Sequence, residues 1–354
     1  MEGEKILNVD AAESRERNVA VVIPAHNEEL TIGGTLASLP VAAGDAYVVD
    51  DGSHDRTSER AAVYTPNVLR LETNVGKAKA TERVLNHYDI LNRYEFVVFS
   101  DADTQLDNNY VLESLDAFDD DAVLVLGQVA NRPKGAIAAF RAFEYSLWQA
   151  VYKNAQSAMK VIFVAPGCAS MYRCSGLKQL SFDADTLAED TDLTLQVHRG
   201  KVGGVRYAAK AVVYTQDPPT VAAYGRQVSR WYTGFWQNVK KHRVPLGRQK
   251  VDLELGYLTF EALFYPFALG LGILFSPFFF KLLLFAFVTE ALVTAGFAAV
   301  VAVKEKRADL FGYCMFFPFF RILNTAIFIS AFTSVVLLGR SGPGWATIPR
   351  YKFN

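Results

Sequence analysis

Apolar and polar positions alternate in blocks along the first 130 residues. Apolar runs typical of buried parallel strands lie at 19–23, 46–50, 67–72 and 95–99, the third weaker than the others. Stretches with helical spacing lie between these runs, at about 28–39, from Ser53 onward, and at 74–88. The alternating order predicts an α/β fold with a doubly wound, mostly parallel sheet.

The pattern continues less regularly after residue 121. Residues 122–129 predict a strand, 135–160 a long helix, and 161–173 a strand, a turn and a second strand. The segment 187–200 predicts a further helix, with Gly200 as its C-cap.

The last third of the chain is almost uninterruptedly apolar. Stretches 256–276 and 278–303 are each long enough to cross a bilayer of about 30 Å. Basic segments at 240–243 and 304–307 flank them and predict an out-and-back hairpin with both ends in the cytoplasm. The stretch 309–338 contains Pro318 and Arg321, so an interfacial helix plus a crossing helix and one broken helix both remain open.

Composition agrees with a soluble part followed by a membrane part. Hydrophobic residues make up 51% of the 354 residues, including 26 Phe, and the formal net charge of −1 argues against nucleic acid as a partner. The polar start of the chain is not a signal peptide, which predicts a cytoplasmic soluble part. Three cysteines, Cys168, Cys174 and Cys314, have no metal-binding spacing and are expected to be buried, reduced thiols.

Asp101 and Asp103 follow the strand at 95–99. If the segment is extended, two carboxylates two positions apart point the same way, which suits Mg²⁺ or Mn²⁺. Ligands of open α/β sheets bind at the carboxyl ends of the strands, which favours a site here. An Asp-x-Asp triplet alone is weak evidence, because it often occurs by chance.

Other polar segments follow the remaining strands. Asn27 and Glu28 in IPAHNEE could line the same crevice as DDGS and NVGKAKA. In DDGS, a carboxylate of the pair Asp50 and Asp51 could accept hydrogen bonds from a nucleobase or ribose, and in NVGKAKA, Lys77 could bind phosphates. The alternative is that DDGS is an ordinary strand-to-helix turn capped by Ser53, and that Lys77 is a solvated lysine at a helix start.

Two further segments carry candidate chemistry. LAEDTDL places Glu189, Asp190 and Asp192 at a helix start, where acids are also favoured for purely structural reasons. QVSRW places Gln227, Arg230 and Trp231 on one helix face, where a guanidinium could neutralise phosphate and an indole could support a sugar ring. The alternative for QVSRW is an amphipathic helix at the membrane surface.

Together these motifs resemble the family 2 inverting glycosyltransferases, and within them the membrane-embedded synthases of hyaluronan, chitin, cellulose and poly-N-acetylglucosamine. The resemblance spans roughly 19–236 and implies a GT-A-like fold with a nucleotide-sugar site. It implies that Asp51 contacts uracil, that Asp101 and Asp103 bind the diphosphate and a Mg²⁺ or Mn²⁺ ion, and that Asp190 is the catalytic base. It also assigns Gln227, Arg230 and Trp231 to the acceptor and pyrophosphate motif.

Helix geometry favours Asp190 over its neighbour. At 100° per residue, Leu193, Thr194 and Val197 fall within about 60° of Asp190, whereas Asp192 points roughly opposite. We therefore expect Asp190 on the inward face and Asp192 in solvent.

The resulting hypothesis is a multi-pass enzyme of the cell membrane with its catalytic domain in the cytoplasm. The expected divisions are a polar segment 1–18, a glycosyltransferase domain 19–236, a basic interfacial linker 237–252, a transmembrane region 253–338 of about three helices, and a tail 339–354. It would move a sugar from a UDP-sugar, with UDP-GlcNAc or UDP-Glc favoured, to a growing β-linked glycan.

Two alternatives remain for the function. One is transfer of a single sugar to a polyprenyl or other lipid acceptor, and the other is a catalytically dead nucleotide-binding protein anchored in the bilayer. Relatives often carry membrane helices before the catalytic domain, whereas this chain shows none there and has only a small apolar region after it. A homo-oligomer or a membrane partner is therefore expected if the product is a long polymer.

Overall fold

The computed structural model describes residues 18–131, 135–244, 249–275, 277–304, 308–340 and 351–352. The expected polar segment 1–18, apart from Asn18, lies outside the described residues, as do most of the basic run 304–307 and most of the tail 339–354. The chain forms two units. The sheet unit comprises Met1–Asn131, Ile162–Gln216 and Arg350–Asn354, and the helical unit comprises Arg132–Val161 and Asp217–Pro349.

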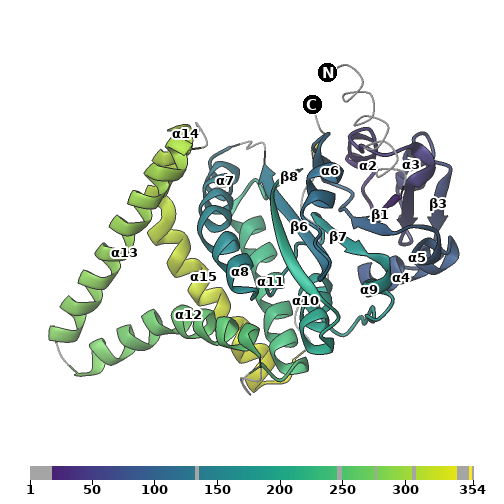
Figure 1. Ribbon diagram of the computed structural model, residues 1–354. Coiled ribbons are helices and arrows are strands. Elements are labelled where there is room, and N and C mark those ends of the chain that lie inside the picture. Colours follow the sequence, from purple (N-terminus) through teal and green to yellow (C-terminus); the bar gives the residue numbers. More distant parts are fainter. Residues whose placement is uncertain are drawn as a thin grey trace, which may run out of the picture. The chain divides into compact units, whose positions relative to one another are not determined.

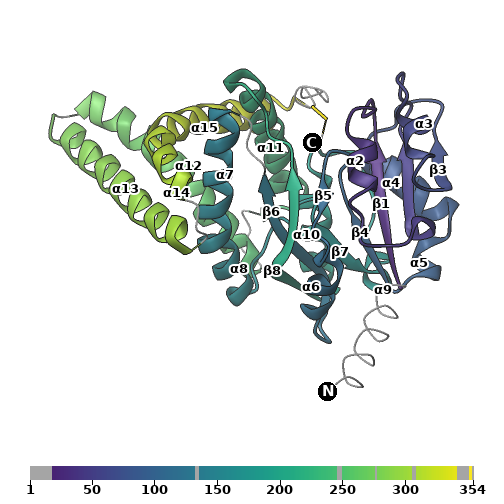
Figure 2. The same ribbon diagram turned by 90° about the horizontal axis from the view of Figure 1, so that it is seen from above.

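The sheet unit is built on one mixed sheet in the order β3-β2-β1-β4-β7-β6-β8-β5 (Figures 1 and 2). Its strands are β1 (Val19–Ala25), β2 (Ala46–Asp50), β3 (Asn67–Arg70), β4 (Phe96–Phe99), β5 (Gln105–Leu106), β6 (Ala122–Asn131), β7 (Ser170–Arg173) and β8 (Gly204–Thr215). Strands β3, β2, β1 and β4 are mutually parallel, as is the β6–β8 pair. Strand β7 is antiparallel to β4 and β6, and β5 is antiparallel to β8.

Both faces of β1 and β4 are buried, because their sequences are apolar at every position. On one face, Ala20 and Val22 of β1 belong to the same core cluster as Val84 of α4 (Lys77–His87) and Val197 of α10 (Glu189–Gly200). On the other face, Val21 of β1 is fully buried. Fully buried strands of this kind require covering layers on both sides, so the doubly wound prediction is confirmed.

Short helices connect the strands of this unit. They are α2 (Ile32–Leu36), η1 (Ala43–Asp45), α3 (Thr57–Ala61), α5 (Ile90–Arg93), α6 (Tyr110–Asp116) and α9 (Cys174–Leu177). Helix α2 is shorter than the expected 28–39. A turn occupies the residues before Ile32, and the helix itself contains two consecutive glycines, Gly33 and Gly34. Glycine weakens helix interiors by roughly 1 kcal/mol each relative to alanine.

Two local predictions were wrong. No strand forms at 161–166, where the chain is irregular, and only the second predicted strand appears, as β7. Helix α10 ends at Gly200 as expected, but Lys201 and not Gly200 takes the left-handed conformation, with φ of 52°. Strand β8 had no counterpart among the predicted elements.

The helical unit contains the long helix expected at 135–160 and the apolar part of the chain. Its elements are α7 (Ala136–Trp148), the π-helical turn η2 (Gln149–Lys153), α8 (Asn154–Met159), α11 (Val221–Lys241), α12 (Lys250–Phe275), α13 (Pro277–Lys304), α14 (Ala308–Phe311), η4 (Gly312–Phe316), α15 (Phe317–Phe332) and η5 (Thr333–Leu337). Among the described residues, Phe280–Val300 and Gly312–Leu337 are long and apolar enough to cross a membrane.

Aromatic side chains join α7, α11 and α15, which lie side by side in Figures 1 and 2. Phe140 of α7 stacks on Phe320 of α15, with ring centroids 4.1 Å apart. Trp236 of α11 packs against Phe328 of α15 and donates an indole N–H to the Phe328 carbonyl oxygen at 3.3 Å. The core of this unit therefore runs along the length of α11.

Candidate active site

The parallel pairing of β2, β1 and β4 brings three polar segments to one edge of the sheet. Ala25, at the end of β1, pairs with Asp50, at the end of β2, and Val22 of β1 pairs with Phe99, at the end of β4. The segments IPAHNEE, DDGS and SDADT therefore leave neighbouring strands at the same edge, where α/β proteins bind their ligands.

The first two of these segments are tied together by hydrogen bonds. The Asn27 backbone N–H donates to Ser53 Oγ at 2.8 Å, and the Asn27 side-chain oxygen accepts from the His54 backbone N–H at 2.9 Å. The Glu28 N–H donates to Thr57 Oγ1 at 2.8 Å, and its carboxylate accepts from Thr31 Oγ1. Asn27 has a φ of 57°, a conformation that asparagine tolerates better than most residues. Asn27 and Glu28 therefore join the segment after β1 to the segment after β2.

Asp51 is buried and fixes the next segment along the chain. Its two carboxylate oxygens accept the backbone N–H groups of Val75 at 2.7 Å and Gly76 at 2.9 Å. The following Gly52 has a φ of 70°, and a Cβ there would lie 2.8 Å from the Asn74 nitrogen. The DDGS turn therefore positions NVGK, the segment that ends in Lys77.

Lys77 links the acids of two other segments. Its ammonium lies 2.6 Å from Asp101 Oδ1 and 2.9 Å from Glu189 Oε1. Burial disfavours the charged ammonium, but the two carboxylates outweigh burial and hold the pKa of Lys77 well above its usual range. Gly167 leaves room for this arrangement, because a Cβ there would lie 2.8 Å from Lys77 Nζ. Lys77 is thus part of an ion-paired cluster, not a solvated surface lysine.

Asp101 and Asp103 lie on a turn and not in an extended segment, so the geometric reason given for their shared direction was wrong. The Thr104 N–H donates to the Asp101 carbonyl oxygen at 3.1 Å, which closes the turn. Asp103 is buried, whereas the Asp101 side chain is 36% exposed. Burial raises the pKa of the neighbouring Cys168 thiol, and the charges of Asp101 and Asp103 raise it further, so both carboxylates lie near this thiol.

Asp190 lies in the first turn of α10 and lines a cavity. Its carboxylate accepts the Gly167 N–H at 3.2 Å and the Thr191 N–H at 2.7 Å. The cavity lining combines Lys77, Glu189 and Asp190 with apolar groups that include Tyr172. Burial, together with the charge of Glu189, raises the pKa of Asp190 to about 6. A carboxylate with such a pKa can accept a proton near neutral pH.

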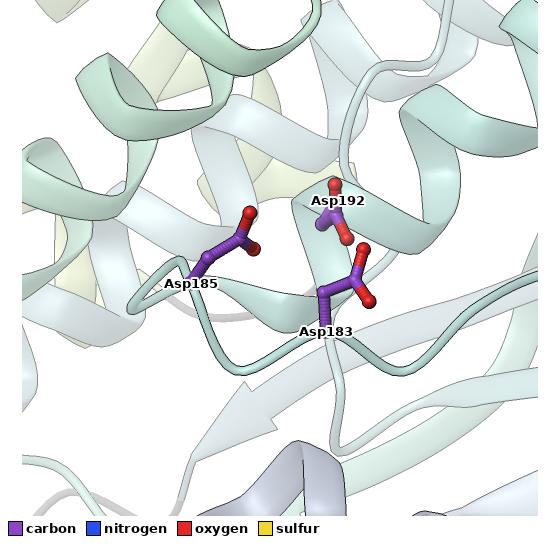
Figure 3. Close-up of side chains that lie close together, drawn as sticks. All are labelled: Asp183, Asp185 and Asp192. Atoms are coloured by element: carbon purple, nitrogen blue, oxygen red, sulfur yellow. The ribbon is translucent and has the colours of Figure 1, made fainter.

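Asp192 is not solvated, so the prediction that it points into water was wrong. It is only 1% exposed, and its Oδ2 accepts from Gln196 Nε2 at 2.9 Å. The loop before α10 brings Asp183 and Asp185 to it, so that one carboxylate oxygen from each of the three lies within 4.8 Å of the others (Figure 3). Asp192 is buried because this loop covers the face of α10 that helical periodicity alone assigns to solvent.

The QVSRW residues lie on α11 of the helical unit, all on a helix as expected. Gln227 and Arg230 are half-buried, and Trp231 is 37% exposed. The side-chain oxygen of Gln227 is buried with no hydrogen-bond partner among the described residues. The other candidates, from Asn27 to Asp190, belong to the sheet unit.

Several residues of this region are not among those predicted from the sequence. Gly167 and Cys168 lie beside the Lys77 cluster, and Asp183 and Asp185 complete the carboxylate group around Asp192. For Gly167 and Cys168, the sequence offered one signal of a site, the turn-like stretch PGCAS that leads into strand β7. None was available for the second pair, because Asp183 and Asp185 lie in a loop without periodic structure.

Comparisons with known proteins agree with this geometry. Residues 20–181 match the model of the family "Glycosyl transferase family 2". The chain is 24% identical to a poly-β-1,6-N-acetyl-D-glucosamine synthase of Staphylococcus epidermidis, over 97% of this chain and 89% of that protein. It is 26% identical to a probable glycosyltransferase of Bacillus subtilis (strain 168), over 90% of this chain and 83% of that one.

A solved structure shares the fold. It is a mannosyltransferase from Pyrobaculum calidifontis, in complex with GDP-Man and Mn²⁺, which is similar with a TM-score of 0.56 and 16% identity over 92% of this chain and 95% of that one. The expected GT-A-like fold is therefore confirmed, with an open mixed sheet. Residues 20–181 therefore form a family 2 glycosyl transferase domain, which supports an enzyme of this class.

Proposed function

We propose that this protein is a membrane-bound inverting glycosyltransferase that moves a sugar from a UDP-sugar to a growing β-linked glycan. The observation that carries the proposal is Asp190. Its half-buried carboxylate lines a cavity beside the Lys77–Asp101 ion pair and has a pKa of about 6. A base of this kind next to a cationic group suits the attack of a hydroxyl on a sugar whose leaving group is a diphosphate.

In the proposed reaction, Asp190 accepts the proton of the acceptor hydroxyl as that oxygen attacks the anomeric carbon. The bond from the anomeric carbon to the diphosphate oxygen breaks on the opposite side, and UDP departs with the bonding electrons. One displacement inverts the configuration, so an α-linked donor gives a β-linked product. Asp190 then returns its proton to solvent.

Asp101 and Asp103 are the residues that would hold Mg²⁺ or Mn²⁺. Their hard oxygen donors, on one turn and one of them partly exposed, fit these ions. The ion, when bound, supplies positive charge to the diphosphate. The Lys77 ammonium already lies 2.6 Å from Asp101, so Lys77 would add a second positive charge for the same phosphates.

The remaining predicted residues receive supporting roles in this proposal. Asp51, held by two backbone amides, would contact uracil, and Asn27 and Glu28 would shape the same pocket wall. Arg230 would neutralise the leaving diphosphate, and Gln227 and Trp231 would contact the acceptor. The exposed part of the Trp231 indole supports the last role, since an apolar ring face suits a sugar.

The sugar is proposed from the relatives. Two proteins similar over nearly the whole chain are poly-β-1,6-N-acetyl-D-glucosamine synthases, which favours UDP-GlcNAc, with UDP-Glc as the next choice. Incubation of the purified full chain with single UDP-sugars, with GDP-mannose, and with Mn²⁺ should release UDP fastest from UDP-GlcNAc. Product mass then separates a growing glycan from a single sugar on a lipid acceptor.

The matched variant pair for this test is Asp190→Asn and Asp192→Asn. Asp190→Asn keeps the shape and removes the base, so transfer should fall by about 10²-fold or more while UDP-sugar binding survives. Asp192→Asn changes a neighbouring carboxylate that does not line the cavity, and should lower transfer far less. The proposal fails if Asp190→Asn retains full transfer, or if none of the nucleotide sugars is consumed.

We further propose a multi-pass location in the cell membrane, with the catalytic part 19–236 in the cytoplasm, the linker 237–252 at the interface and 253–338 in the bilayer. Two apolar helices and the membrane synthases among the relatives support this location. If the product is a long polymer, we expect a homo-oligomer or a membrane partner. Mass measurement in detergent, combined with product sizing, tests that expectation.

A further inference from the structure

A buried arginine in the helical unit lies against the tryptophan of QVSRW. Arg141 of α7 is 6% exposed, and its guanidinium carbon lies 5.0 Å from the ring centroid of Trp231 on α11. The same carbon lies 4.5 Å from the Tyr145 ring and 5.4 Å from the Tyr224 ring. One guanidinium thus contacts three aromatic rings from two helices.

Acidic groups hold this guanidinium in place. Arg141 Nη1 lies 2.7 Å from Glu144 Oε2, and its Nε lies 3.7 Å from Asp217 Oδ1. Arg141 Nη2 donates to the Tyr145 hydroxyl at 2.9 Å, and that hydroxyl donates to Asp217 at 3.3 Å. Glu144 and Asp217 are both less than 10% exposed. Because these contacts come from α7 and from a residue four positions before α11, the guanidinium is held independently of Trp231.

Trp231 contacts this guanidinium and is also partly exposed. The indole rests on the guanidinium, yet 37% of the residue remains exposed, more than Tyr224 or Trp236 on the same helix. A flat cation stacks on an indole face and restricts its rotation, whereas a lysine ammonium offers no plane. The Trp231 side chain therefore contacts a fixed cation and remains partly accessible.

We propose that Arg141 is a positioning residue that fixes the Trp231 indole as the platform for the acceptor sugar. Glu144 and Asp217 anchor Arg141, and Arg141 acts through Trp231 without touching the substrate. This inference rests on the proposed function, in which Trp231 contacts the acceptor. It accounts for a buried charge cluster that the proposed chemistry does not otherwise use.

The test compares Arg141→Lys in two backgrounds, the natural chain and Trp231→Ala. Arg141→Lys keeps the charge and removes the planar stack, so kcat/KM for the acceptor should fall by about 10-fold in the natural background. UDP release from the donor in the absence of acceptor should stay within about twofold. In the Trp231→Ala background, the same substitution should add less than about a twofold loss, because two residues that act through one contact are not additive.

A matched control is Arg173→Lys. Arg173 also stacks on two rings, Phe96 at 5.0 Å and Phe118 at 5.4 Å, and pairs with a glutamate at 3.1 Å, but it lies in the sheet unit. It controls for a general loss of packing and should not change the acceptor kcat/KM. Glu144→Gln offers a second route, since it loosens the anchor and leaves both Arg141 and Trp231 in place.

Fluorescence supplies a readout that does not need activity. Acrylamide quenching of Trp231, taken as the difference from a Trp231→Phe chain, should increase in Arg141→Lys and in Glu144→Gln. Near-normal acceptor transfer in Trp231→Ala would overturn the acceptor role of this tryptophan, and the inference with it. A strong loss in Trp231→Ala, combined with an equal effect of Arg141→Lys in both backgrounds or unchanged quenching, would overturn only the positioning role of Arg141.

Discussion

Two carboxylates two positions apart on α10, Asp190 and Asp192, have different surroundings. Asp190 lines a cavity beside Glu189 and Lys77, whereas Asp192 is covered by the preceding loop and bonded to Gln196. Burial alone therefore does not distinguish a base from a structural acid. The position of Asp190 at a cavity does, since Asp192 also lies near like charges, those of Asp183 and Asp185.

The pH dependence of turnover should report the surroundings of Asp190. A base must be ionised, so the rate should fall below about pH 6, the pKa of Asp190 in the folded protein. Glu189 raises that pKa, so Glu189→Gln should lower it and shift the acidic limb of the kcat/KM profile to lower pH. The profile should be measured with saturating metal ion.

The control for this shift is Glu59→Gln, the same change on an exposed glutamate that pairs with Arg56 on α3. Its acidic limb should match that of the natural chain. A limb that moves to higher pH in Glu189→Gln would contradict the assignment of Asp190 as the base.

Removal of divalent metal should abolish transfer, and Mn²⁺ or Mg²⁺ should restore it. Asp103→Asn should raise the metal concentration for half-maximal activity by about 10-fold or more, since changes outside the ligand set alone often cost that much. Asp183→Asn, in the carboxylate group of Figure 3, is the comparison variant and should leave this concentration unchanged. Full activity after thorough chelation would exclude a required metal at Asp101 and Asp103.

Individual side-chain contacts were the least predictable part of the site. The sequence places Asp51, Lys77 and Asp101 after successive strands, and parallel pairing then brings those segments together. It does not reveal that Lys77 pairs with both Asp101 and Glu189, because the acids lie 24 and 112 positions further along the chain. Arg141 and Trp231, whose side chains are in contact, are likewise far apart in the sequence.

Among the helices and strands, prediction from the sequence succeeded where the run of apolar residues is continuous. Strands β1, β2 and β4 are buried on both faces, so their apolar runs are unbroken. Strand β8 mixes buried and exposed positions without a regular period, and it contains register shifts against β6, so neither the alternating nor the continuous pattern is visible in its sequence. Residues 161–166 are apolar because they are buried or half-buried in the fold, but they do not pair with a neighbouring strand.

The turn after β2 gives a test of backbone fit. Gly52→Ala should destabilise the protein by more than about 1–2 kcal/mol, since the left-handed conformation costs that much and the new Cβ would also meet backbone atoms of Thr73 and Asn74 at 2.8 Å. Gly76→Ala is the matched control, because Gly76 has a φ of 87° with nothing within 4 Å of its Cβ position. The midpoint temperature of thermal unfolding should therefore be much lower for Gly52→Ala than for Gly76→Ala. Equal effects would mean that the DDGS turn relaxes without cost.

In the apolar part of the chain, polar groups meet one another within the helical unit. Arg321 of α15 pairs with Glu261 of α12 at 2.7 Å, and Asn324 accepts from the Tyr224 hydroxyl of α11 at 2.9 Å. Helix α11 also carries Arg226, Lys240 and Lys241, which favour water. The segment Gly312–Leu337 is apolar enough to cross, but α15 packs along α11 from Phe320 to Phe332. Within the proposed membrane region 253–338, we therefore expect α15 to lie along the membrane surface and α12 and α13 to cross.

That arrangement predicts an even number of crossings, with the C-terminal tail on the side of the catalytic part. Tyr351 supports this, because its carbonyl oxygen accepts from Gln216 Nε2 at 2.6 Å and its N–H donates to Gln216 Oε1 at 3.1 Å, both within the sheet unit. In a Cys314→Ser chain, a cysteine at Lys352 should react with a membrane-impermeant thiol reagent in inside-out vesicles but not in intact cells. A cysteine at Phe278, near the start of α13, should react in intact cells. Labelling of Lys352→Cys from outside would require an odd number of crossings, and it would return α15 to the membrane-spanning interpretation.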